Sequence, residues 1–136
     1  MRHLAPLALL LLSGCVSSSS VRPLRDYEIA IGPYHERSTQ SFVGSLMYEG
    51  RCLLFDGENG SMRLLPIWPG GTRFEESLVT FHQPAKSDQR VAIGEEIRLD
   101  GVPTQWSALD PRAFAPFHQQ CGWAKPFFVS GLAPAN

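Results

Sequence analysis

Cys15 has the most distinctive chemical setting in the chain, because its thiol follows an apolar run near the amino terminus. The run covers residues 4–12, Arg2 and His3 precede it, and Ser13 and Gly14 separate it from the cysteine. A basic start, a short apolar stretch and small residues before a cleavage point are the three parts of a secretory signal. The run is too short to span a bilayer, which takes about 20 apolar residues. The pattern predicts export and removal of the leading residues.

The tetrapeptide Leu12-Ser13-Gly14-Cys15 resembles the processing site of bacterial lipoproteins, a resemblance that covers residues 1–20. It implies a diacylglycerol group on the Cys15 sulfur, removal of residues 1–14 and acylation of the new amino terminus, and several acyl chains make a lasting anchor where one is marginal. Val16, which is not an aspartate, implies an outer-membrane location facing the periplasm. The alternatives are an ordinary secretory signal with an incidental cysteine and a buried core helix.

Cys52 and Cys121 are the two cysteines that remain once Cys15 is lipidated. An even pair in an exported chain predicts a disulfide, because the compartment is oxidising. Closing a loop of that length constrains the unfolded chain by roughly 4 kcal/mol. Two buried thiols, a metal site or a catalytic cysteine are the alternatives, and neither cysteine has the nearby second ligand that a metal site needs.

Catalytic signatures are missing from the sequence: it has no Gly-x-Ser-x-Gly elbow, no His-Glu-x-x-His and no phosphate-binding glycine loop. We therefore expect no catalytic residues, no metal and no cofactor. His82 and His118 are the residues that could overturn this expectation, if they converge with Glu75 on a metal or a substrate. Their spacing is not that of a chelating pair, so surface or capping roles are the simpler interpretation.

Trp68, Trp106 and Trp123 each border a loop that contains proline or glycine. Large rings in such loops can offer flat apolar platforms to sugar rings, peptides or bases, so these three are our candidate ligand-binding residues. The competing interpretation is that the rings close the ends of a small core. It is stronger for Trp68, because Trp106 and Trp123 lie in the least regular part of the chain, where function tends to collect.

The elements that must position these residues are short strands, because apolar side chains alternate with polar ones and turn residues are frequent. Expected strands cover residues 42–55, 62–68, 76–83, 90–93, 96–100 and 127–132. Residues 56–60 read as a hairpin loop with two glycines. Asp110 and Pro111 are typical of a helix start, yet Pro116 is expected to stop that helix after about a turn.

These features predict an all-β fold. A long glycine-broken first strand, a hairpin and a last strand after an irregular connection resemble an OB-like or related Greek-key barrel of about five or six strands. Segments 50–53 (Gly-Arg-Cys-Leu) and 68–71 (Trp-Pro-Gly-Gly) are similar to those of uncharacterised bacterial envelope proteins, a likeness that implies no activity. A seven-stranded sandwich is the alternative if residues 102–125 hide further strands.

The chain divides into a signal (1–14), a lipidated cysteine with a flexible tether (15–40) and a barrel domain (41–136). A tether of about 25 residues would reach roughly 25–30 Å and let the domain stand clear of the headgroups. Part of this tether could instead form a short strand or pack on the body, through Tyr27, Ile29, Ile31 and Tyr34. The chain has 12 Lys plus Arg residues, scattered along the sequence, and 13 Asp plus Glu residues. It therefore lacks the clustered positive charge that binding of nucleic acid requires.

The sequence thus predicts a lipid-anchored accessory protein of the cell envelope, held to the membrane, whose small barrel presents loops to an envelope protein, a glycan or a small ligand. One alternative is a small periplasmic hydrolase or metal-binding protein that uses His82 and His118. Another is a purely structural envelope component.

Overall fold

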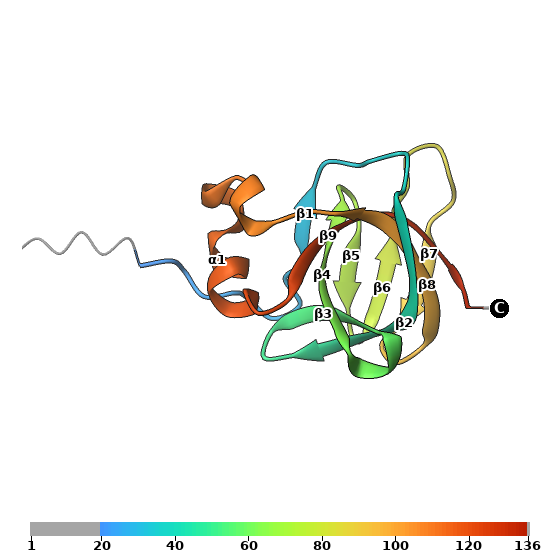
Figure 1. Ribbon diagram of the computed structural model, residues 1–136, viewed down its shortest axis with the longest axis horizontal. Helices are drawn as coiled ribbons and strands as arrows, with labels where there is room; N and C mark the ends of the chain where they lie inside the picture. Colours follow the sequence, from blue (N-terminus) through green and yellow to red (C-terminus); the bar gives the residue numbers. More distant parts are fainter. Residues whose placement is uncertain (1–19, 136) are drawn as a thin grey trace, which may run out of the picture.

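Five strands form the barrel in the computed structural model, which describes residues 20–135 (Figure 1). They are β2 (Gln40–Glu49), β3 (Cys52–Gly57), β4 (Met62–Pro69), β8 (Glu96–Pro103) and β9 (Lys125–Pro134). β2 pairs antiparallel with both β3 and β8, and β8 pairs antiparallel with β9. Parallel pairing of β4 with β9, from Leu64↔Lys125 to Ile67↔Phe128, closes the barrel. The expectation of a small OB-like Greek-key barrel is confirmed.

A three-stranded sheet lies between β4 and β8 in the chain. It consists of β5 (Arg73–Glu75), β6 (Leu78–Phe81) and β7 (Gln89–Ala92). Its Phe74, Val79, Phe81 and Val91 join the barrel interior in one apolar cluster. The largest member of that cluster, Trp68, packs edge-to-face on Phe81 at a centroid distance of 5.8 Å. This sheet therefore completes the main core.

A second core lies on the outer side of β3 and β4. It is covered by helix α1 (Pro111–Cys121) and by the segment that leads from Leu24 to the short strand β1 (Ala30–Gly32). β3 and β4 are buried on both faces, because their alternate residues point into the two cores. That double burial explains why residues 52–55 form an unbroken apolar run.

The expected strand over residues 42–55 is two strands joined by a tight turn. Gly50 and Arg51 both have positive φ, 57° and 69°, as the turn of a two-residue hairpin requires. The chain reverses there, so the inward positions change from Leu46 in β2 to Leu53 and Phe55 in β3, while Leu54 faces the second core. A continuous alternation through Gly50 was the wrong interpretation.

Helix α1 also differs from the expectation, because it continues through Pro116 to Cys121. Asp110 does begin it, with its side chain accepting a hydrogen bond from the backbone N–H of Arg112. Pro116 forfeits a backbone hydrogen bond, but the helix buries Phe114 and Phe117 beside it. Burial of two large rings offsets the roughly 3 kcal/mol that an interior proline costs. Residues 102–125 contain no strand apart from the ends of β8 and β9, so the sandwich is not formed.

The predicted tether is wrong for the segment from Leu24 to Gly32, which packs on the body. Leu24 and Ala30 are each 1% exposed, and β1 pairs in parallel with β4 through Ala30↔Ile67. Both alternatives for this segment are found, because a short strand forms around Ile31, while Tyr27 and Ile29 pack on the body. The sequence of this segment is mostly polar, but a few apolar side chains suffice to fix it. Cys15 and the signal lie outside the described residues.

Candidate functional site

A groove crosses the end of the barrel at which β4 and β9 begin and β8 ends. Two adjoining hollows, of about 500 Å³ and about 510 Å³, share Pro103, Thr104, Trp123 and Lys125 as walls. We call their union the Trp123 groove. The mouth of a barrel is a common position for a binding site, because loops meet there over a rigid frame.

Trp123 is the most exposed large apolar side chain of the described part of the chain, at 56%. It follows Gly122, the C-cap residue of α1, and stands between the two hollows. Phe42 and Phe127, which pack edge-to-face at 5.7 Å, form the floor with Leu64. The groove therefore combines an apolar floor with one flat ring that is free to meet a partner.

Two cations border the groove in different electrostatic states. The Arg63 guanidinium is held by two carboxylates, with Nε 3.3 Å from Asp56 Oδ1 and Nη1 3.4 Å from Glu49 Oε2. Lys125 forms no ion pair with any residue between 20 and 135. The exposed Lys125 ammonium is thus the positive charge that a partner would meet.

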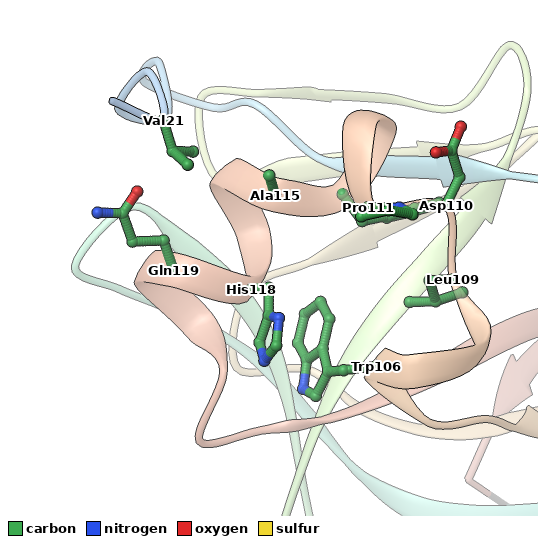
Figure 2. Close-up of a pocket in the computed structure, with 9 residues that line it drawn as sticks. Val21, Trp106, Leu109, Asp110, Pro111, Ala115, His118 and Gln119 are labelled. Atoms are coloured by element: carbon green, nitrogen blue, oxygen red, sulfur yellow. The ribbon is translucent and has the colours of Figure 1, made fainter. Parts of the chain in front are cut away.

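Trp106 forms a wall between the Trp123 groove and a third hollow of about 370 Å³ beside α1. Its indole N–H donates to the Ala124 carbonyl at 3.0 Å, and its ring stacks on His118 at 4.6 Å with an interplanar angle of 7°. Figure 2 shows the two rings face to face below α1, with Val21 at the outer rim. Hydrogen bonding and stacking leave Trp106 as a fixed wall, in contrast to Trp123.

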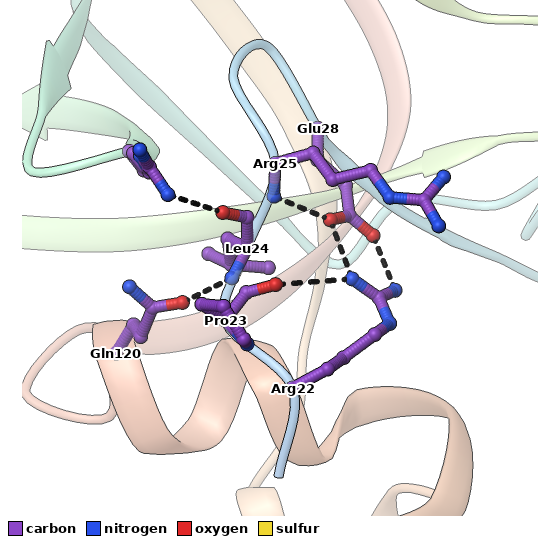
Figure 3. A network of polar contacts seen from close by, with 7 residues as sticks. Arg22, Pro23, Leu24, Arg25, Glu28 and Gln120 are labelled. Carbon is purple, nitrogen blue, oxygen red and sulfur yellow. Dashed lines mark hydrogen bonds and ion pairs between the residues drawn. The ribbon is translucent and has the colours of Figure 1, made fainter.

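The segment before β1 is held against α1 by polar contacts (Figure 3). The Leu24 N–H donates to Gln120 Oε1, and Arg51 Nη1 donates to the Leu24 carbonyl at 2.9 Å. Arg22 donates to both carboxylate oxygens of Glu28, at 2.9 and 2.6 Å. These hydrogen bonds from Arg22, aided by the Arg25 backbone N–H, lower the pKa of Glu28. The network fixes where the amino-terminal chain reaches the body.

The predicted disulfide between Cys52 and Cys121 is confirmed, with 6.0 Å between the two Cα atoms. It ties the start of β3 to the last residue of α1, two residues before Trp123. The bridge therefore anchors the backbone that carries the exposed ring.

The other candidates from the sequence lie apart from the groove. Trp68 is completely buried in the main core, so its ring is unavailable to a ligand and the core interpretation is correct for it. His82 Nδ1 lies 2.8 Å from Asp88 Oδ1 after β6, whereas His118 stacks on Trp106. Nowhere in residues 20–135 do three potential metal ligands come together. Lys125 and Phe42 were missed, since the chain gives no sign that β2 and β9 begin at the same end of the barrel.

Comparisons with protein-family models, curated proteins and solved structures gave no match for this chain. Among the described residues, no helix has the length and apolar character needed to cross a membrane. The site must therefore be interpreted from its own chemistry.

Proposed function

We propose that this protein is a lipid-anchored accessory protein of the cell envelope, in which the barrel is a binding module and the Trp123 groove is its binding surface. The observation that carries the binding role is the 56% exposure of Trp123 between two hollows. A folded chain gains about 25 cal/mol for each Å² of apolar surface that it buries. Contiguous apolar surface at a groove, here the exposed Trp123 ring with the groove floor of Phe42, Leu64 and Phe127, is typical of a site that a partner covers.

The chemistry of the groove suits binding. Its groups are an aromatic ring, an apolar floor, an ammonium and the polar side chains of Gln40 and Thr104. At many interfaces a few aromatic side chains, packed in apolar pockets, contribute most of the binding free energy. A reaction such as acyl transfer would need a nucleophile, a base and an oxyanion site held together.

The anchor is proposed from the sequence, with Cys15 as the lipidated residue and the outer membrane, facing the periplasm, as the location. It is tested by labelling cells with a palmitate analogue. The wild-type protein should carry the label and the Cys15→Ser protein should not. Equal labelling of the two proteins would contradict the proposal.

The binding surface is tested by placing a photo-crosslinking amino acid at position 123 of the full-length protein in cells. We expect a discrete crosslinked product from position 123. Position 43 is the matched control, because Val43 is 46% exposed and lies outside the Trp123 groove. The same products from both positions, or none from position 123, would refute the assignment of the groove.

A further inference from the structure

The place where the amino-terminal chain joins the body restricts how a lipid anchor could hold it. The described chain begins at Ser20, and Val21 lines the hollow beside α1. Four residues lie between Cys15 and Ser20, and the five residue steps from Cys15 to Ser20 span at most about 18 Å. An anchor on Cys15 would therefore keep the α1 end of the molecule within that distance of the membrane surface.

This end of the molecule also carries the Trp123 groove. Val21 and Trp106 line one hollow, and Trp106 and Trp123 line the next, so a continuous surface leads from the entry of the chain to the exposed ring. Figure 1 shows the blue start of the described chain beside α1, at the same end of the molecule as the 3-10 turn that carries Trp106. A short link at Cys15 would bring this surface toward the bilayer.

The charges of this surface favour an anionic layer. Residues 101–126, which supply its helix and loops, contain Arg112 and Lys125 and a single acidic residue, Asp110. The Asp110 carboxylate is engaged at the start of α1, where it accepts the Arg112 N–H at 3.0 Å. Both basic side chains are exposed, and Lys125 stands at the rim beside Trp123.

We propose that the occupant of the Trp123 groove is the headgroup layer of anionic phospholipid in the membrane that holds the anchor. Trp123 enters the interface between headgroups and acyl chains, where tryptophan side chains concentrate. Lys125 lies at the level of the phosphates, which attract basic residues near the surface. The lipid on Cys15 and the Trp123 face then act as two membrane signals, and together they fix the orientation of the barrel. This inference rests on the proposed lipid anchor.

The test uses the lipidated protein reconstituted in vesicles of phosphatidylethanolamine and phosphatidylglycerol that contain phosphatidylcholine with brominated acyl chains. Bromine quenches the fluorescence of indoles that reach the acyl region. We expect quenching of the wild-type protein and loss of at least half of it in Trp123→Phe. Val43→Ala, altered at an exposed site away from the groove, should keep the wild-type value. Lys125→Gln should be quenched less than the wild type in these vesicles. When phosphatidylglycerol is replaced by a neutral lipid, Lys125→Gln and the wild type should be quenched equally.

Mass spectrometry of the same sample separates the two proposals. If Cys15 carries its lipid and Trp123→Phe is quenched as strongly as the wild type, the membrane contact is refuted while the anchor stands. Tryptophan emission that is not quenched by brominated lipid but shifts when soluble glycan fragments are added would also refute the membrane contact. It would assign the groove to a glycan. An unmodified Cys15 would overturn the anchor and this inference with it.

Discussion

At Gly44, strand β2 passes so close to β3 that any side chain would collide with backbone. A Cβ built there would lie 2.1 Å from the Asp56 carbonyl oxygen and 2.8 Å from Gly57 Cα. Backbone cannot rotate away as a side chain can, so the two paired strands would have to separate. We predict that Gly44→Ala lowers the free energy of unfolding by about 3 kcal/mol, the upper part of the usual range for overpacking.

The control for this prediction is Gly70→Ala. A Cβ at Gly70 would have no neighbour within 4 Å, so this variant should stay within about 0.5 kcal/mol of the wild type, as surface substitutions usually do. Urea denaturation followed by tryptophan fluorescence measures both variants. Equal stability of the two proteins would show that β2 and β3 can separate without cost.

The three tryptophans show what sequence can say about a single side chain. Trp68 is fully buried, Trp106 is fixed by a hydrogen bond and a stacked histidine, and Trp123 is 56% exposed. All three stand beside proline or glycine in the sequence, so local context cannot rank them. Their exposure depends on which strand ends meet at the barrel mouth, and that is a property of the closed fold. The sequence could therefore identify three candidate rings but could not predict which of them is exposed.

The amino-terminal segment is an integral element of the fold, because Leu24 is buried between α1 and the outer face of the barrel. Leu24→Ala should reduce the free energy of unfolding by about 2–5 kcal/mol, as removal of a buried leucine side chain does. Ile31→Ala is the control within the same segment, since Ile31 is 43% exposed and should cost much less. Thermal unfolding compares the two. A loss below about 0.5 kcal/mol for Leu24→Ala would mean that the segment behaves as the tether predicted from sequence.

Helix α1 depends on a covalent link as well as on packing. The Cys52–Cys121 bridge spans 69 residues of chain, so its removal should lower the free energy of unfolding by about 4 kcal/mol, mainly by freeing the unfolded chain. The double variant Cys52→Ala/Cys121→Ala, measured by urea denaturation beside the oxidised wild type, checks the value. Reduced wild type is the second reference, and it should match the double variant to within the cost of two small apolar substitutions. Full stability without the bridge would contradict its structural role.

At the level of elements, sequence patterns identified most of the barrel strands but not how they connect. Residues 62–68 and 96–100 lie within β4 and β8, and the strand expected at residues 127–132 lies within β9. The hairpin turn at Gly50 and Arg51 was missed because Arg51 is an unusual residue at positive φ. The length of α1 was missed because its stability comes from burial of Phe114 and Phe117 and from the bridge at Cys121, and none of these is local.

For the whole molecule, the packed amino-terminal segment changes the relation between anchor and domain. A tether through residue 40 would let the barrel turn freely above the membrane, whereas the structure leaves four residues between Cys15 and Ser20. A link this short raises the effective concentration of the Trp123 face at the bilayer, because it limits both distance and rotation. The proposed anchor and the proposed membrane contact are thus coupled through the length of the link.

That coupling predicts the effect of lengthening the link. Inserting about twelve Gly and Ser residues after Ser19 adds roughly 40 Å of maximum reach and should let the domain rotate away from the surface. We expect bromolipid quenching of Trp123 to fall at least twofold, with the unfolding free energy unchanged because Ser20 is exposed and lies outside both cores. Insertion of the same length into the exposed loop after Pro84, which leaves the link intact, should leave quenching at the wild-type level. Undiminished quenching with the longer link would mean that the Trp123 face binds the bilayer without help from the anchor, and that the link does not set the orientation.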